Sequence, residues 1–186
     1  MTTYKTSGRT STSKRRAESL IILGLDPGTA ATGYGAVLFE NGCLHLERCG
    51  VWRPPNALPL SARLHFVSEK LVALLDELRP AAVSVETVFT AKNVTSTMKL
   101  SHARGVLLAA AARFDIPVFE YEPRLVKKAL VGYGHAEKLQ VRAMVLALLS
   151  RQRDRVPLDA ADALAVAICH VHAGPPRGRE TEIGKL

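Results

Sequence analysis

Three segments near the start of the chain carry apolar side chains with the period of a β-strand. Residues 21–26 are apolar up to Asp26, whereas residues 32–39 and 43–53 alternate between apolar and polar side chains. The Asp-Pro-Gly-Thr sequence after the first segment is typical of a tight turn, and two prolines end the third segment. The pattern predicts three antiparallel strands, with Asp26 at the end of the first and central one.

The rest of the chain alternates between helical and strand patterns. Apolar residues recur at intervals of three and four over residues 60–78, which predicts an amphipathic crossover helix that ends before Pro80. Residues 81–88 and 116–121 are predicted to be short strands. The order of these elements indicates an α/β fold. Further helices are predicted over residues 92–114, 124–131, 136–151 and 158–172.

The composition fits one folded domain between two polar ends. The chain has 186 residues, 47% of them hydrophobic, which is enough for one core and too little for two full domains. Residues 1–20 contain five basic residues, one acidic residue and hardly any side chain that could build a core, so we expect a disordered basic extension there. Residues 21–172 form the predicted domain, and residues 173–186 a flexible tail.

Charge, hydropathy and cysteine content indicate which binding partner and which cellular compartment suit the protein. The formal net charge is +8, and residues 92–155 hold twelve basic residues against five acidic ones. A polyanion such as a nucleic acid suits this excess. No apolar run reaches the roughly 18 residues of a membrane span. Three cysteines without a CxxC spacing favour a reducing compartment, so we expect a cytoplasmic protein with no membrane partner.

Four carboxylates lie where this fold would bring them together. Asp26 ends an otherwise apolar strand, and Glu86 lies near the end of the fourth strand, on the opposite side from its valines. Asp159 and Asp162 are three residues apart in the first turns of a small, apolar helix that is expected to pack on the sheet. We expect that helix to carry both acids inward.

Each acid also has an ordinary structural explanation. Asp26 could cap its Asp-Pro-Gly turn, and the two aspartates of the last helix could stabilise its N-terminus through the helix dipole. A zinc site of Cys169, His170 and His172 is a weaker alternative, because residues two apart on a helix point away from each other.

Convergence of all four acids would require cations, because their mutual repulsion opposes it. Hard oxygen ligands with open positions suit Mg²⁺ or Mn²⁺, and about four negative charges match two divalent ions. Two such ions can activate a water towards a phosphodiester and stabilise the departing oxygen. The acids and the basic surface together favour metal-dependent hydrolysis of a nucleic acid.

Several segments together resemble one family of nucleases. In chain order they are ILGLDPG, TGYG, VETVFTAKN, MKLSHARGV, FEYEPRLVKKALVGYGHAEKLQV and DAADALAVAICH. Residues 21–172 look like the RuvC-type Holliday-junction resolvases, a branch of the ribonuclease H-like nucleases. The resemblance implies a five-stranded mixed sheet with helices on both faces, a homodimer, and metal-dependent paired cleavage of four-way DNA junctions in recombination and repair. It also implies the RuvA-RuvB branch-migration complex as a partner.

The resemblance further implies roles for individual residues. Phe89 matches an aromatic that stacks on a base near the crossover, and Lys127 and Lys138 match basic positions at the DNA. The family's four catalytic positions, which bind two metal ions, correspond to Asp26, Glu86, Asp159 and Asp162. Further candidates for DNA binding in the basic half of the chain are Lys92, Arg124 and Arg142.

Two other functions fit parts of the sequence. The turn after Asp26 is similar to the phosphate-binding turn of actin-like ATPases and sugar kinases, which share the ribonuclease H-like core. Those proteins need two such cores and the chain holds one, and an ATP-induced thermal shift would favour this function. A non-catalytic DNA-binding module would explain the basic second half of the chain. It would leave four aligned acids without a purpose, since acids repel phosphate.

Overall fold

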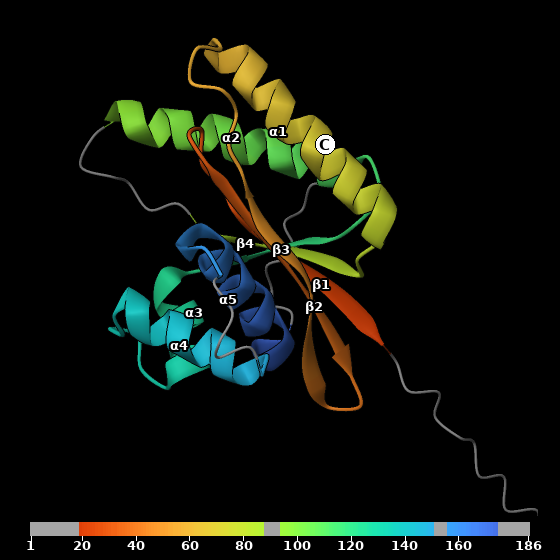
Figure 1. Cartoon of the computed structure of the whole chain (residues 1–186), viewed down its shortest axis with the longest axis vertical. Helices are drawn as coiled ribbons and strands as arrows, with labels where there is room; N and C mark the ends of the chain where they lie inside the picture. Colours follow the sequence, from red (N-terminus) through yellow and green to blue (C-terminus); the bar gives the residue numbers. More distant parts are fainter. Residues whose placement is uncertain (1–18, 88–93, 151–155, 175–186) are drawn as a thin grey trace, which may run out of the picture.

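One five-stranded sheet, in the strand order β3-β2-β1-β4-β5, forms the centre of the computed structural model, which describes residues 19–87, 94–150 and 156–174 (Figure 1). The first three strands are antiparallel, and β4 and β5 continue the sheet parallel to β1. The predicted mixed sheet with a central first strand is thus confirmed. The strands are β1 (Leu20–Asp26), β2 (Thr32–Glu40), β3 (Cys43–Trp52), β4 (Ala82–Glu86) and β5 (Val118–Tyr121).

Helices cover both faces of this sheet (Figure 1). Two of them, α1 and α2, contact each other on one face, and the other three lie on the opposite face. There α5 contacts β1, β2 and β4 directly, while α3 and α4 pack on α5 from outside. The helices are α1 (Leu60–Leu78), α2 (Val94–Ala112), α3 (Pro123–Val131), α4 (Lys138–Leu148) and α5 (Leu158–Ala173).

Side-chain alternation along β1 divides the core into two layers. Leu23 and Leu25 are fully buried in the layer with α1 and α2, whereas Ile22 belongs to the layer with α5. Gly24 also faces α5, because a Cβ there would collide with the carbonyl oxygen of Ala163. Asp26 follows Gly24 by two residues, so the period of the strand turns its side chain to the α5 side.

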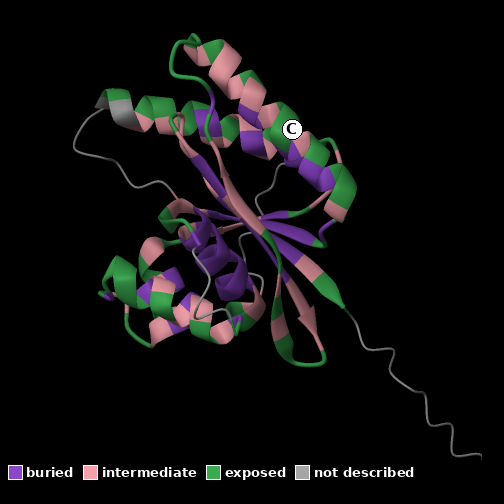
Figure 2. Cartoon of the chain, viewed as in Figure 1, coloured by how far each residue is buried: buried purple, intermediate pink, exposed green. Residues whose placement is uncertain are grey.

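Glycines and alanines allow α5 to lie close to the sheet. A Cβ on Gly33 would collide with the carbonyl of Asp159, and one on Gly35 would collide with Leu164. The helix is buried over almost its whole length, as Figure 2 shows, and Asp162 is the least covered residue between Ala160 and His170. The acidic surface of this helix is therefore at its N-terminal end, with Asp159 and Asp162.

Two helices are shorter than predicted, for local reasons. The helix predicted through residue 114 ends at Ala112, and Asp115 follows with a left-handed φ of 54°. The helix predicted from residue 136 begins at Lys138, because Glu137 and Gln140 form a capping box. In that box the Glu137 backbone N–H donates to Gln140 Oε1 at 2.9 Å.

Some predictions fall on parts of the chain that lie outside the described residues. These are the base-stacking aromatic Phe89, the basic candidate Lys92, and most of the extension over 1–20 and of the tail over 173–186. β1 begins at Leu20 and α5 ends at Ala173, so the folded part exceeds the predicted domain by one residue at each end. None of the described helices is long and apolar enough to cross a membrane.

Candidate active site

Asp26 and Glu86 end two neighbouring parallel strands. Leu25 pairs with Val85 in the ladder between β1 and β4, so the next residues of the two strands lie beside each other at the same edge of the sheet. Leu25 and Val85 face α1 and α2. Alternation therefore turns both carboxylates towards the other face, the one that α5 covers.

Asp159 and Asp162 lie at the N-terminal end of α5, where the helix dipole favours negative charge. The backbone of Asp159 packs against Gly33, and Gly33 is the residue paired with Asp26 in the ladder between β1 and β2. The first turn of α5 thus lies directly over the strand end that carries Asp26. All four predicted carboxylates come together at one edge of the sheet.

The two strand carboxylates are in an unfavourable environment for their charge. Burial, followed by the negative charges of Asp162 and Glu86, raises the pKa of Asp26 from 3.8 to about 7. Burial and the charge of Asp162 also raise the pKa of Glu86, while Lys138 and Lys127 act in the opposite direction. Both carboxylates would therefore gain from a cation placed between them.

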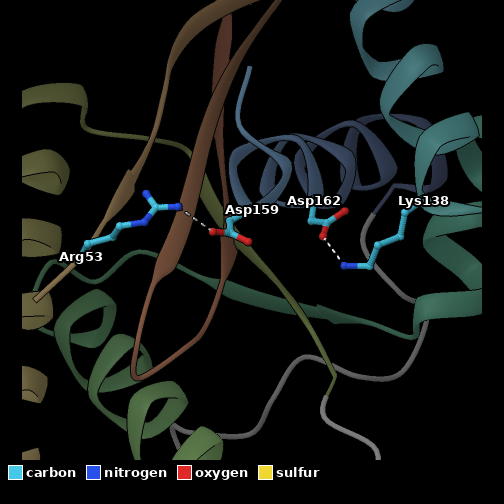
Figure 3. A network of polar contacts seen from close by, with 4 residues as sticks. All are labelled: Arg53, Lys138, Asp159 and Asp162. Atoms are coloured by element: carbon cyan, nitrogen blue, oxygen red, sulfur yellow. Dashed lines mark hydrogen bonds and ion pairs between the residues drawn. The ribbon is translucent and has the colours of Figure 1, made fainter. Parts of the chain in front are cut away.

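The two helix carboxylates each have a cation of the protein itself (Figure 3). Arg53, which follows β3, lies with Nη2 3.2 Å from Asp159 Oδ2, and Lys138 lies with Nζ 2.9 Å from Asp162 Oδ2. Figure 3 shows the two acids directed to opposite sides, each towards its partner. The hydrogen bond and the charge of Asp162 raise the pKa of Lys138, so this side chain is a firm cation at neutral pH.

A pocket of about 260 Å³ opens beside Glu86 and Asp162. It is bounded by β4, α3, α4 and α5, and Lys127 and Lys138 contribute two positive charges to its wall. Apolar side chains such as Val126 complete the lining. The pocket therefore joins two candidate metal ligands to the two lysines predicted to lie at the DNA.

Two further basic candidates, Arg124 and Arg142, lie on the same two helices. Arg124 is three residues before Lys127 on α3, which places both on one side of that helix, and Arg124 is exposed. Arg142 is one turn after Lys138 on α4, but its Nε is buried and has no hydrogen-bond partner among the described residues. Arg124 is thus available to a large ligand, and Arg142 is only partly so.

The donor set suits a hard divalent cation. Within the described residues, no three His, Cys, Asp or Glu side chains converge closely enough to hold an ion as they stand. The two ion pairs draw Asp159 and Asp162 apart, while Asp26 carries a strongly raised pKa that a cation would lower. Carboxylate oxygens are ligands that Mg²⁺ and Mn²⁺ prefer, so the residues fit such ions after the helix side chains turn inward.

The alternative zinc site on α5 is not formed by its three residues. His170 is buried, and its Nδ1 lies 2.6 Å from the hydroxyl of Tyr121 on β5. Cys169 is buried, and burial raises its pKa to about 12, whereas His172 is exposed. The side chains of the helix end thus point to different surroundings, as their spacing indicates.

Arg53 is a site residue that the sequence pattern did not reveal. It is 106 residues from Asp159 along the chain, and it follows a strand whose periodicity predicts only its own pairing. Its neighbour Trp52 stacks on Tyr34 of β2 with ring centroids 4.5 Å apart. The sequence offered one signal for it. Arg53 is a basic residue directly after a strand, and that strand end lies at the edge of the sheet where the acids lie.

Comparison with known proteins assigns a family to most of the chain. Residues 22–170 match the family described as "Crossover junction endodeoxyribonuclease RuvC". A protein of that name from Desulfitobacterium hafniense is 44% identical over 154 residues, which cover 83% of this chain and 93% of the relative. Another from Syntrophomonas wolfei is 47% identical over 152 residues, covering 82% and 88% of the two chains.

Solved structures show the same similarity in three dimensions. The structure of Thermus thermophilus RuvC superposes with a TM-score of 0.77 at 33% identity and covers 82% of this chain and 94% of that one. The same protein in complex with a Holliday junction substrate gives a TM-score of 0.79 at 32% identity, with coverage of 83% and 94%.

Proposed function

The chain belongs to the family of the crossover junction endodeoxyribonuclease RuvC, and we propose that it resolves four-way DNA junctions by metal-dependent hydrolysis of phosphodiester bonds. The observation that carries this proposal is the meeting of two strand carboxylates and two helix carboxylates at one edge of the sheet. Such an enzyme acts in DNA recombination and repair.

We propose that the four carboxylates hold two Mg²⁺ or Mn²⁺ ions. Ions bound there would activate a water and stabilise the oxygen that leaves the phosphorus. Asp26 would be a ligand at the centre of this set, because the charges of all three other acids act on it. The raised pKa values of Asp26 and Glu86 support the assignment, since each carboxylate would be stabilised in its charged form by a bound cation.

The lysines of the pocket provide contacts to the DNA backbone. Lys127 and Lys138 line the same wall as Glu86 and Asp162, so a phosphate that approaches the carboxylates meets two ammonium groups. Arg124 extends this positive surface along α3. Arg142 and Lys92 remain candidates for DNA binding from the basic half of the chain, and Phe89 remains the base-stacking aromatic that the family resemblance implies. These contacts position a duplex arm without reading its sequence.

We propose that the protein is a homodimer that pairs through α2. This helix buries Ala103 and Leu107 against its own core, but Met98 is 58% exposed. Gly105 has open space around it, and Ala109 is exposed on the same side. The small residues Gly105 and Ala109 on this side suit close approach of a second copy. A two-fold dimer would present two identical sites to a nearly two-fold junction, and paired nicks follow from that symmetry.

The dimer can be tested by placing a charge on this exposed side of α2. Ala109→Asp should halve the mass measured by light scattering at micromolar concentration and reduce cleavage to uncoupled single nicks. Ala143→Asp makes the same change on an exposed position of α4 and should keep the native mass. A native chain that is a monomer and still cuts both strands together would contradict the dimer.

Partners and compartment follow the family assignment as proposals. The RuvA-RuvB branch-migration complex would deliver the junction, and the cytoplasm would be the place of action.

A nucleotide-binding function like that of sugar kinases is the other candidate from the sequence, but the basic pocket beside the carboxylates favours a nucleic acid. The same pocket distinguishes the nuclease from a DNA-binding module without catalysis, because such a module has no use for acids next to phosphate.

The proposed function is tested with a labelled four-way junction and a duplex of matched sequence, each incubated with and without Mg²⁺ or Mn²⁺. We expect symmetric paired nicks in the junction only, and only with the divalent ion. Equal cleavage of the duplex, or cleavage that survives a chelator, would contradict the proposal.

A further inference from the structure

Arg53 makes an ion pair with Asp159, a proposed metal ligand. Neither the stability of the protein nor the local fold requires this ion pair. The Arg53 side chain is 60% exposed and that of Asp159 is 39% exposed. Ion pairs as open to water as this one contribute little to folding, because both charges are well solvated when they separate. The pair nevertheless joins β3 to the first turn of α5, across the edge of the sheet where the acids meet.

The backbone of Arg53 is held firmly while its side chain is free to turn. The preceding Trp52 stacks on Tyr34 with an interplanar angle of 21°, and the following Pro54 is buried. These two neighbours fix the point from which the arginine side chain extends. Its guanidinium can therefore leave Asp159 by rotation about side-chain bonds alone, with no change in the strand.

The guanidinium and a divalent ion oppose each other at Asp159. Arg53 donates to Asp159 Oδ2 and holds this carboxylate on the side away from Asp162 (Figure 3). A positive charge within hydrogen-bond distance of this oxygen repels a second cation that approaches the same carboxylate. The arginine therefore acts on the helix carboxylate Asp159, to which it is bound.

We propose that Arg53 is a displaceable counter-ion: it competes with a divalent ion for Asp159, and when the ion binds, the released guanidinium contacts a phosphate of the DNA. The inference rests on the proposed metal-dependent function and adds a positioning residue to it. Binding of metal and binding of substrate are coupled by this exchange, because the ion that occupies Asp159 also makes an arginine available to the DNA backbone.

The first test measures metal affinity without DNA, by calorimetric titration of Mn²⁺ into the full chain. Arg53→Gln should bind Mn²⁺ about threefold to tenfold more tightly than the wild type, because one competing charge is removed. Arg53→Lys keeps the charge and should stay near the wild-type value. Arg48→Gln is the matched control: it removes the same charge from β3, the strand that Arg53 follows, where Arg48 pairs with Glu77 at 2.5 Å, and it should not alter Mn²⁺ affinity.

The second test measures the salt dependence of binding to a four-way junction in Ca²⁺. The slope of log K against log salt is negative, and loss of one phosphate contact makes it shallower by about 0.9. Arg53→Gln should show this reduction in the presence of Ca²⁺ and none in a chelator, where the guanidinium stays on Asp159. Arg48→Gln should keep the wild-type slope in both conditions.

The outcomes separate this inference from the function on which it rests. If the wild type binds Mn²⁺ and Arg53→Gln binds it equally or more weakly, the competition is refuted and the proposed function stands. If the salt slopes of Arg53→Gln and of the wild type are equal in Ca²⁺, or differ as much in a chelator as in Ca²⁺, the transfer to phosphate is refuted. If the wild type and Arg48→Gln both fail to bind Mn²⁺, the proposed function is itself contradicted.

Discussion

The two pairs of carboxylates in the site have the same chemistry and opposite surroundings. Asp26 and Glu86 extend from rigid strand ends into a partly buried place, and burial is the main cause of their raised pKa values. Asp159 and Asp162 extend from the first turns of a helix, and each is bound to a basic side chain. The strand pair is fixed and short of positive charge, whereas the helix pair is adjustable and already neutralised.

The difference shows how a cluster of four acids can exist in a folded protein. The electrostatic cost is concentrated on the strand pair, where the sheet holds the carboxylates in place. The helix pair avoids that cost through Arg53 and Lys138, both of which are largely exposed and can move. Divalent ions would thus be attracted by the strand pair and would recruit the helix pair from its ion pairs.

The largest predicted effect is on cleavage and is common to both pairs. Replacing any one carboxylate with its amide removes a proposed metal ligand, and a loss of several kcal/mol of transition-state stabilisation lowers the rate by about 10³-fold or more. Junction affinity should be kept or increased, because a negative charge that faces phosphate is removed. The variants are Asp26→Asn, Glu86→Gln, Asp159→Asn and Asp162→Asn, measured by junction cleavage and by gel shift. Near-normal cleavage by any one of them would remove that residue from the ligand set.

The next prediction separates the two pairs by stability and pH. The folded-state pKa of Asp26, about 7, is above its unfolded value of 3.8, so the folded chain binds the proton more tightly. The free energy of unfolding should therefore fall as pH rises from about 4 to about 7. In a chelator at pH 8, Asp26→Asn should be more stable than the wild type by at most about 4 kcal/mol, at 1.36 kcal/mol for each pKa unit.

Urea unfolding at pH 4 and pH 8 checks this prediction. The advantage of Asp26→Asn should shrink at pH 4, where the aspartate is protonated in the folded state. If the difference in unfolding free energy between Asp26→Asn and the wild type is the same at both pH values, Asp26 is not short of positive charge. In the same experiment at pH 8 without chelator, we expect added Mn²⁺ to stabilise the wild type and to leave Asp26→Asn nearly unchanged.

The smallest predicted effect is on the stability of the helix pair. Asp159→Asn and Asp162→Asn should change the free energy of unfolding by no more than about 1 kcal/mol, because each breaks an ion pair whose cation is largely open to water. The partners remain well solvated, since 73% of the Lys138 side chain is exposed. The same urea experiment at pH 8 measures this effect. A loss of several kcal/mol would mean that these ion pairs hold α5 on the sheet, against the contrast drawn between the pairs.

Sequence periodicity predicted nearly every element and the edge of the sheet where the acids meet. The reason is that each strand and helix carries its own apolar period, and that Asp26 and Glu86 interrupt apolar runs. Pairing across long separations has no such local signal. Arg53 and Asp159 are 106 residues apart, so their contact depends on how closely α5 packs on β2, which the glycines set.

Local chemistry explains the smaller differences in the same way. Glu137 caps α4, although glutamate is not a usual N-cap residue, so the predicted start of the helix was two residues early. The opposite directions of Asp159 and Asp162 could not be predicted either. Helical spacing places both acids on one face, and only the position of Arg53 and Lys138 draws them apart.

Anomalous diffraction from crystals soaked in MnCl₂ tests the central claim most directly. The account predicts manganese peaks in contact with Asp26 and Glu86, with Asp159 and Asp162 turned towards them and away from Arg53 and Lys138. The peaks should be absent in Asp26→Asn crystals treated in the same way. Manganese bound elsewhere on the protein, with no peak at these four carboxylates, would contradict the claim that they form the metal site.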